Sequence, residues 1–500
     1  MHACDAVSLD AALRDLKRPV RVGDAAAPAL APENLGDPGF RREHGVRYAY
    51  ATGSMANGIA SAELVEAGAG AGVLSFFGAA GLAPEAVEAA IERLRSALGG
   101  APHGFNLIHS PSEPALEDAV CDLYLRRGVR LVEASAFMGL TPAIVRYRLR
   151  GLRRGADGRV SAPNKVVAKV SRAEVAEKFL SPAPEEMRRE MAAAGAITRE
   201  EAALAAEVPM AQDVTVEADS GGHTDNRPLV SLLPAILALR DRVASRHRFA
   251  VPPRVGAAGG IATPASAAAA YLMGAAYVLT GSVNQSCVES GSSDRVRAML
   301  AAAGQTDVAM APAADMFEMG VRVQILKRGT MFAMRAAKLY EIYRAHDSIE
   351  AVPASARAAL ERDLFREPLE AVWEKTRDFF LRRDPAQVER ADRDPKHKLA
   401  LVFRSYLGQS SRWANSGAAD RTLDYQVWCG PAMGAFNEWV RGGFLQAPEN
   451  RRVGTVARNI LYGAAVLTRA HFLRCQGVAL DPEAVRIEPL TPDELDRRLN

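Results

Sequence analysis

Two glycine-rich turns are the segments with the clearest capacity for chemistry. Gly256-Ala-Ala-Gly259-Gly260-Ile261 follows a short apolar run and precedes an alanine-rich helical pattern, and Thr280-Gly281-Ser282 ends the next apolar run. Glycines at a strand-to-helix turn let backbone N–H groups approach an anion, and the helix N-terminus adds a partial positive charge. The pattern predicts a phosphate site built from Ala258, Gly259, Gly260, Gly281 and Ser282. The alternative is a tight turn whose glycines serve packing alone.

The two turns lack the motifs of dinucleotide-binding and P-loop proteins, which narrows the kind of phosphate-bearing ligand. They do not form a GxGxxG dinucleotide fingerprint, because they come late in the chain without an acidic residue placed to hold a ribose, and they are not GxxxxGK[ST]. A mononucleotide flavin, FMN, bound on a barrel fits better.

Other polar groups and glycines near strand ends support the same flavin site. Asn106 could pair with the pyrimidine edge of the flavin, and Lys169 could be the cation that stabilises its reduced form. Taken singly, each of these residues could equally be structural: Gly53, Ser54, Met55, Asn106 and Lys169.

A histidine follows two glycines in Glu217-Ala-Asp-Ser-Gly221-Gly222-His223-Thr-Asp225. Gly221 and Gly222 would let the chain pass under a flavin ring and carry His223 to the same rim. Histidine is the side chain whose ordinary pKa lies nearest neutrality, which suits proton donation or abstraction. We expect His223 to be the catalytic residue, although an isolated histidine is more often a core or surface residue.

Eight short apolar or β-branched runs must position these groups. Helical patterns separate most of them, which predicts parallel strands that close into a (β/α)8 barrel, with an open doubly wound sheet as the alternative. In such a barrel functional groups gather at the C-terminal ends of the strands, and the last two loops hold phosphate. The predicted strands are residues 48–52, 72–76, 104–108, 130–134, 166–170, 214–218, 254–257 and 277–280.

Turn signals and changes of pattern indicate how the rest of the chain is organised. The fifth crossover, 181–207, contains two helical patterns split by Gly195, and the arginine-rich segment 146–159 contains an Asp157-Gly158 hairpin signal that predicts a surface excursion. After residue 290 strand signals are scarce and helical patterns dominate, at residues 295–303, 332–344, 354–363, 368–382 and 453–476. We therefore expect an extension over 1–40, an FMN-binding barrel over 41–290 and a mainly helical substrate or lid domain over 291–500. A stripe of Met310, Met316, Phe317 and Met319 is read as core of that domain.

Composition excludes several classes of protein. The 500 residues are 48% hydrophobic and 24% charged, with 62 basic and 59 acidic residues, so the net charge of +3 gives no sign of nucleic-acid binding. The five cysteines are scattered, which is typical of a reducing compartment, and Cys121 and Cys287 are expected to be buried structural thiols. Neither a signal peptide nor a membrane span is expected, and we predict a cytoplasmic protein. No histidine pair has metal-ligand spacing and no GxSxG elbow occurs, so neither a catalytic metal nor hydrolase chemistry is expected.

Several of these segments carry a family resemblance. The runs GFNLIHSP, VEASAF, KVVAKVSR, EADSGGHTDNRP and GAAGGIATPASAAAAYLMGAAYVLTGSVNQ, with LVFRSYLGQSSRWA and WCGPAMGAFNEW in the second half, resemble the trans-acting enoyl reductases of polyunsaturated fatty acid and polyketide synthases, the PfaD type. More distantly, the barrel is similar to nitronate monooxygenases and FMN-dependent enoyl reductases. The resemblance covers nearly the whole chain.

The resemblance implies an enzyme that reduces the α,β-double bond of enoyl thioesters carried on acyl carrier protein, with NADPH or NADH as the reductant. His223 matches the histidine that is the base of nitronate monooxygenases, and it would here supply a proton or hold the thioester carbonyl. By the same analogy the segment Pro431-Ala-Met-Gly434 would close over the flavin. A nitronate monooxygenase-like oxidoreductase and a catalytically idle docking protein are the alternatives, and a homodimer is possible.

Overall fold

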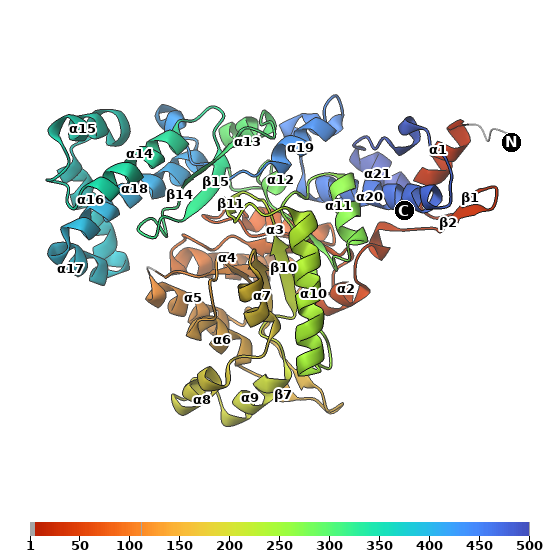
Figure 1. The fold of residues 1–500 in the computed structure, drawn as a ribbon, viewed down its shortest axis with the longest axis horizontal. Helices are drawn as coiled ribbons and strands as arrows, with labels where there is room; N and C mark the ends of the chain where they lie inside the picture. The colour runs from red at the N-terminus through yellow and green to blue at the C-terminus, as the bar shows by residue number, and fades with distance from the viewer. Residues whose placement is uncertain (1–5, 112, 500) are drawn as a thin grey trace.

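Eight parallel strands between residues 50 and 280 close into a barrel. In Figure 1 the second half of the chain, teal to blue, lies above the orange-to-lime half that contains these strands. The structure, a computed structural model, describes residues 6–111 and 113–499. The spatial strand order is β10-β12-β13-β3-β4-β5-β6-β9, so the expected (β/α)8 barrel is confirmed and the open sheet is wrong. The barrel strands are β3 (Tyr50–Thr52), β4 (Leu74–Phe77), β5 (Gly104–Ile108), β6 (Leu131–Ser135), β9 (Lys165–Val170), β10 (Asp213–Glu217), β12 (Arg254–Ala258) and β13 (Val278–Thr280).

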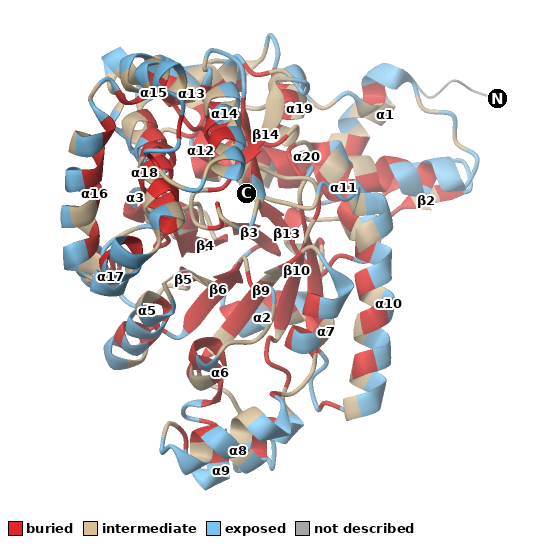
Figure 2. Cartoon of the chain, turned by 60° about the vertical axis from the view of Figure 1, so that its left-hand side comes forward, coloured by how far each residue is buried: buried red, intermediate tan, exposed pale blue. Residues whose placement is uncertain are grey.

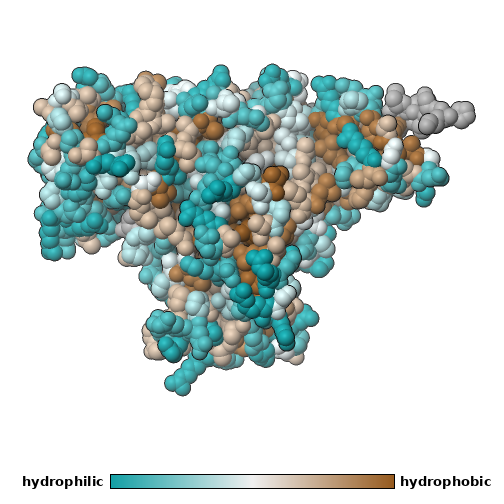
Figure 3. All heavy atoms as spheres, in the orientation of Figure 1, coloured by the Kyte–Doolittle hydropathy of each residue, from teal (hydrophilic) through white to brown (hydrophobic). Residues whose placement is uncertain are grey.

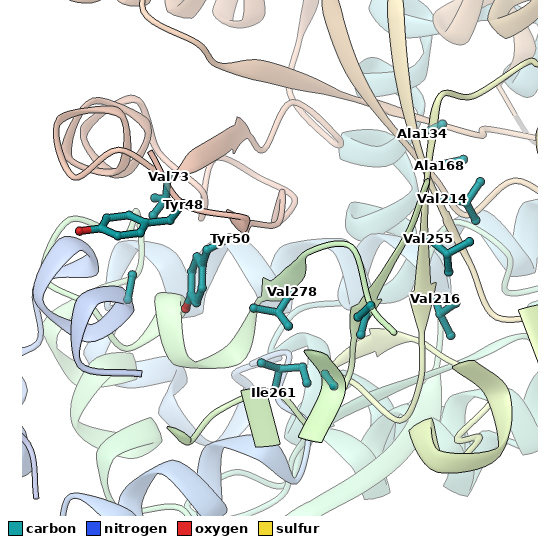
Figure 4. Packing of buried hydrophobic residues seen from close by; sticks show 14 of the residues in the cluster. Tyr48, Tyr50, Val73, Ala134, Ala168, Val214, Val216, Val255, Ile261 and Val278 are labelled. Carbon is teal, nitrogen blue, oxygen red and sulfur yellow. The ribbon is translucent and has the colours of Figure 1, made fainter. Parts of the chain in front are cut away.

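Helices surround the barrel, and apolar side chains of the strands pack against them. Figure 4 shows Ala134, Ala168, Val214 and Val255 on neighbouring strands within the largest core cluster. Cys121 and Cys287 are buried, as expected, whereas Cys4 lies outside the described residues. The helices of the crossovers are α3 (Ala62–Gly70), α4 (Pro84–Leu98), α5 (Pro114–Arg127), α6 (Pro142–Leu149), α7 (Ala173–Leu180), α10 (Leu229–His247) and α11 (Pro264–Leu272).

The two local features expected in the barrel half are present. The fifth crossover holds α8 (Glu185–Ala193) and α9 (Arg199–Leu204), and Gly195 between them has a φ of 71°. The hairpin at Gly158 joins β7 (Arg153–Arg154) to β8 (Val160–Ser161). The arginine-rich segment is not wholly a surface excursion, because Arg148 is buried and donates hydrogen bonds to the carbonyls of Pro209 and Asn164.

The N-terminal end of the barrel is closed by α2 (Pro38–His44). Its Phe40 stacks on Tyr277 with ring centroids 4.2 Å apart, and both rings are buried. His44 Nε2 lies 2.7 Å from Asp213 Oδ2, while Arg254 donates to both oxygens of the same carboxylate at 2.6 and 3.0 Å. Burial alone would raise the pKa of Asp213, but His44 and Arg254 hold it below its usual value. This end is therefore sealed, and functional groups must gather at the other end.

Replacing Asp213 with asparagine is expected to lower the free energy of unfolding at neutral pH by about 3–5 kcal/mol, because it leaves the buried Arg254 without its carboxylate. A carboxyl with a depressed folded-state pKa stabilises above its unfolded pKa and loses this contribution as the pH falls through the folded pKa. The difference between wild type and Asp213→Asn, measured by urea denaturation, should therefore shrink in acid. The exposed Asp241→Asn is the control, and an equal loss in both variants would contradict the role of the cluster.

The second half of the chain adds a mainly helical module, residues 294–439, which contains a separate core of buried side chains between residues 311 and 407. It begins with α13 (Asp294–Ala301) and contains two strands that the sequence analysis did not predict, β14 (Val308–Pro312) and β15 (Arg322–Leu326). They form a sheet with β11 (Gly222–His223) in the order β11-β15-β14. The reading of the methionine stripe as core holds for Met316 and Phe317, whereas Met319 is exposed and Met310 lies in β14.

The helices of this module lie at the C-terminal end of the barrel (Figure 2), and the face of the module seen in Figure 3 is mainly hydrophilic with scattered apolar residues. These helices are α14 (Phe332–Ala345), α15 (Ala354–Ala359), a π-helical turn (Leu360–Phe365), α16 (Leu369–Arg383), α17 (Pro385–Arg393), α18 (Pro395–Ser416), α19 (Ala432–Trp439) and, beyond the module, α20 (Val453–Cys475) and α21 (Pro492–Leu499). The predicted patterns at 332–344, 354–363, 368–382 and 453–476 are confirmed, whereas α17, α18, α19 and α21 were not predicted.

The two ends of the chain pack together on the barrel. Helix α20 lies against α11 and α3 and against the hairpin of β1 (Val20–Val22) and β2 (Ala25–Ala27), next to α1 (Ala6–Arg14). Arg469 of α20 is fully buried and donates hydrogen bonds to the carbonyls of Leu13, Asp15 and Arg18. Within the described part of the chain, no helix is long and apolar enough to cross a membrane.

Candidate functional site

A cavity of about 650 Å³ lies between the C-terminal ends of the barrel strands and helices α16 and α18. Several predicted site residues line it together: Ser54, Met55, Asn106, Lys169, Gly221, Gly222 and His223. The remaining predicted residues (Gly53, Ala258, Gly259, Gly260, Gly281 and Ser282) lie outside its wall, at the ends of β3, β12 and β13. These three strands are neighbours in the barrel, so all the predicted groups share one rim.

His223 is held by an element from outside the barrel. It belongs to β11, which pairs antiparallel with β15 and places His223 opposite Val323. His223 Nε2 lies 3.2 Å from Asp315 Oδ1, in the loop between β14 and β15. Burial alone would lower the pKa of His223, but Asp315 raises it above its usual value, and His223 in turn lowers the pKa of Asp315. The pair therefore favours a protonated imidazole facing the cavity.

Replacing Asp315 with asparagine is expected to lower the pKa of His223, because the carboxylate that stabilises the imidazolium is lost while burial remains. The imidazole should then lose its proton at a lower pH, which NMR titration of its ring protons measures directly. Asp225→Asn is the control, since that carboxylate binds Ser171 and Arg172 instead. An unchanged titration in Asp315→Asn would show that Asp315 does not set the protonation of His223.

Lys169 is fixed between two carboxylates at the same rim. Its Nζ lies 3.4 Å from Glu217 and 3.7 Å from Glu133, and these two carboxylates raise its pKa against the effect of burial. Glu133 is fully buried, which raises its pKa, and it accepts hydrogen bonds from the backbone N–H and the hydroxyl of Ser54. Its Oε1 has no hydrogen-bond partner in the described part of the chain. The charge of Lys169 is thus already compensated by two carboxylates, an arrangement that was not predicted from the sequence.

Asn106 is oriented by its neighbours on β6. Its amide Nδ2 donates to the carbonyl of Glu133 at 3.1 Å and to Ser135 Oγ at 2.9 Å, and its own backbone carbonyl accepts from the Tyr124 hydroxyl at 2.6 Å. The first two bonds fix the plane of the side-chain amide at the cavity wall. Asn106 is therefore a preorganised polar group, as binding of a planar ring requires.

The two glycine turns fit an anion. Gly259 and Gly260 have φ of 80° and 75°, and side-chain atoms at Gly260 or Gly281 would project into open space. Among the described residues, the backbone N–H groups of Gly259, Gly260, Gly281 and Ser282 have no protein acceptor. At Gly259 a Cβ would instead lie 2.6 Å from Ala218, so this position needs glycine for packing too. The first turn of α11 uses its own Thr263–Ser266 capping box, which leaves the loop amides, not this helix N-terminus, for an anion.

A late segment of the chain returns to this rim. The N–H of Gly430 donates to Ser282 Oγ at 3.1 Å, and a Cβ on Gly430 would lie 2.7 Å from the backbone of Gly221. The two glycines therefore let the backbones cross closely, and Trp428 lines the cavity beside them. Gly434 instead packs against Gln305, so the part of this segment that reaches the cavity precedes the PAMG run that the sequence analysis singled out.

The helical module forms the opposite wall and is bonded to the barrel. Arg383 of α16 donates to both oxygens of Glu113 at the start of α5, at 2.6 and 3.2 Å. Asn57 of the barrel rim donates to Ser411 of α18 at 3.0 Å. Arg404 of α18 binds the carbonyl of Ala314 at 2.9 Å, next to Asp315. The cavity is therefore a joint product of barrel and module.

Comparison with known proteins identifies the barrel. The sequence model of the nitronate monooxygenase family matches residues 44–363, which include all of the barrel strands and the His223–Asp315 pair. The chain belongs to this family. A second family model, the inserted helical domain of [acyl-carrier-protein] S-malonyltransferase, matches residues 346–425.

The chain also has relatives among synthase proteins. It is 48% identical over 481 residues to a polyunsaturated fatty acid synthase protein of Thraustochytrium sp., covering 94% of this chain and 32% of that protein. It is 45% identical over 439 residues to the polyketide biosynthesis protein PksE of Bacillus subtilis, covering 88% of this chain and 57% of PksE. These identities confirm the resemblance to PfaD-type proteins. The chain spans less than two thirds of the length of either relative.

A solved structure shares most of the fold. The chain is 37% identical to the enoyl reductase domain of MlnA from the macrolactin biosynthesis cluster of Bacillus amyloliquefaciens, with a TM-score of 0.83, covering 89% of this chain and 99% of that domain. At this coverage the likeness includes both the barrel and most of the helical half, so the two parts also occur together in that domain.

Proposed function

We propose that the chain is an FMN-dependent enoyl reductase that acts on enoyl thioesters carried on acyl carrier protein, with NADPH or NADH as the electron donor. The observation that carries this proposal is the His223–Asp315 pair in a cavity that adjoins turns with free backbone N–H groups. The MlnA domain, which is named as an enoyl reductase domain, supports the reaction class. The synthase relatives, and the match to the inserted helical domain of [acyl-carrier-protein] S-malonyltransferase, support the carrier.

The residues at the rim would divide the work of binding. Gly259, Gly260, Gly281 and Ser282 would hold the FMN phosphate through backbone N–H groups, next to Ala258, and the ring would lie near Gly53, Ser54, Met55, Asn106, Lys169, Gly221 and Gly222. Reduced FMN supplies a hydride for the β-carbon of the enoyl group when it is bound. His223, whose pKa Asp315 raises, would donate the proton that the α-carbon takes up or hydrogen-bond to the thioester carbonyl. Helices α16 and α18 would exclude water from the acyl chain.

Purified protein tests the proposal. We expect a yellow solution with flavin absorbance and, under anaerobic conditions, reduction of a crotonyl thioester with NADPH or NADH. A colourless protein that takes up no FMN would contradict the proposal and favour a docking role. Oligomeric state, including a homodimer, is measured on the same sample by light scattering.

A nitronate monooxygenase-like oxidase is the second candidate, because the family match includes the barrel and because His223 faces the cavity, where it could act as a base. The raised pKa of His223 is less suited to a base than to an acid at neutral pH. Oxygen-dependent turnover of a nitroalkane without thioester reduction would establish this second reaction instead.

A further inference from the structure

The cavity meets solvent at one edge of the helical module. Most of its lining residues are buried or half-buried, and the exposed ones mark the mouth: Gly81, Lys375, Gly408, Gln409 and Arg412. Four of them belong to α16 and α18, which lie side by side next to the ends of the barrel strands (Figure 2). All four fall within residues 346–425, the segment that matches the inserted helical domain of [acyl-carrier-protein] S-malonyltransferase.

Arg412 differs from the other cations of the cavity wall. Lys375 pairs with Glu367, Arg383 with Glu113 and Arg404 with Glu318, whereas Arg412 has no acidic partner in the described part of the chain. Its guanidinium lies 5.6 Å from the centroid of the Phe379 ring, which also lines the cavity. The aromatic contact orients the guanidinium without neutralising its charge.

The neighbours of Arg412 on α18 leave room and add a donor. Gly408 precedes Arg412 by one helical turn, and a Cβ there would meet nothing within 4 Å. A glycine inside a helix is unfavourable compared with alanine, and packing does not require one here. Gln409, three residues before Arg412 on the same face, presents an exposed amide. The mouth thus combines an open passage with an unpaired cation and a hydrogen-bond donor.

We propose that Arg412, with Gln409, binds the 4′-phosphate of the pantetheine arm of a carrier protein, whose thioester end passes Gly408 toward His223. The inference rests on the proposed function, because it assumes that a thioester enters this cavity. A phosphate at the far end of the arm places its charge at the solvent edge, where an exposed guanidinium binds it without a desolvation cost at the reacting end. Arg412 is therefore a binding residue, not a catalytic one.

Calorimetric binding of two saturated probes, butyryl-4′-phosphopantetheine and butyryl-pantetheine, tests the site without turnover. The wild type should bind the phosphorylated probe roughly tenfold more tightly, as expected for a hydrogen-bonded charge, and Arg412→Gln should abolish this preference. Arg382→Gln is the matched control, an exposed arginine on α16 that lies outside the cavity wall, and it should keep the preference. Equal binding of both probes by the wild type, or a preference that survives in Arg412→Gln, would overturn the proposal.

Two further arms separate the sources of phosphate. Butyryl-CoA carries the same 4′-phosphate, and tighter binding than that of butyryl-4′-phosphopantetheine would overturn the assignment to a carrier-borne arm. If Arg412→Gln weakened NADPH binding and left the pantetheine probes unchanged, the guanidinium would belong to the reductant's site and the proposal would be wrong.

Gly408→Leu provides a second variant. Its side chain is expected to narrow the passage and weaken both probes roughly tenfold, while the thermal midpoint should not fall, because leucine favours a helix more than glycine does. Unchanged binding of both probes would contradict the passage at Gly408. Failure of the wild type to reduce any thioester would refute the proposed function, whereas the binding preference would still decide the phosphate site.

Discussion

Replacing His223 with alanine should lower kcat for thioester reduction by about a hundredfold to ten-thousandfold, the usual contribution of a positioned general acid. Bound FMN should be retained, because His223 belongs to β11 and not to the glycine turns that would hold the phosphate. Stopped-flow spectroscopy separates the steps: reduction of the flavin by NADPH should be nearly unchanged, and reoxidation by the enoyl thioester should be slow. His247→Ala, at the end of α10, is the control.

The His223–Asp315 pair predicts how thioester reduction depends on pH. A protonated His223 is the active form of an acid, so kcat should fall as the pH rises through its raised pKa. In Asp315→Asn this fall should come at a lower pH. The double variant of His223 and Asp315 should be no slower than His223→Ala, because Asp315 acts only through the imidazole. Wild-type activity in His223→Ala would end the proposed role.

The barrel was predictable because its strands are short apolar runs with both faces buried, bounded by turn residues, so each stands out from the helices around it. Strand β14 was not, because Val308–Pro312 has a weak strand pattern and ends in proline. The sheet order β11-β15-β14 makes β14 an edge strand, where a proline is tolerated. Helix α18 was missed for a similar local reason, since Gly408 and several serines reduce its helix propensity.

The candidate site, like the fold, could be predicted only where the local sequence carried a signal. Residues at strand ends could be found by counting strands, since the topology of a barrel brings those ends to one rim. Asp315 could not, because it lies 92 residues from His223 and meets it only through the unpredicted pairing of β11 with β15. Glu133 did leave a signal, an acidic residue inside the buried strand LVEAS, where a charge requires a partner such as Lys169.

Replacing Gly260 with valine should raise the Kd for FMN at least a hundredfold and yield a largely colourless protein. A side chain there would project into the space beside free N–H groups that the phosphate would occupy. The φ of 75° adds backbone strain of about 1–2 kcal/mol for a residue with a Cβ, which shifts the turn itself. Flavin absorbance after gel filtration, and a fluorescence titration with added FMN, measure the loss.

Two further valine variants separate the effect of backbone strain from the effect of a side chain that fills the phosphate space. Gly158→Val has nearly the same φ, 76°, and the same open surroundings, but lies in the hairpin of β7 and β8, so it carries the strain without the site. Gly281→Val has a φ of −128° and fills the cradle from the other turn. We expect Gly260→Val and Gly281→Val to lose FMN and Gly158→Val to keep it. If all three variants held FMN as tightly as the wild type, the turns would not be its phosphate site, and the flavin would have to bind elsewhere at the barrel mouth.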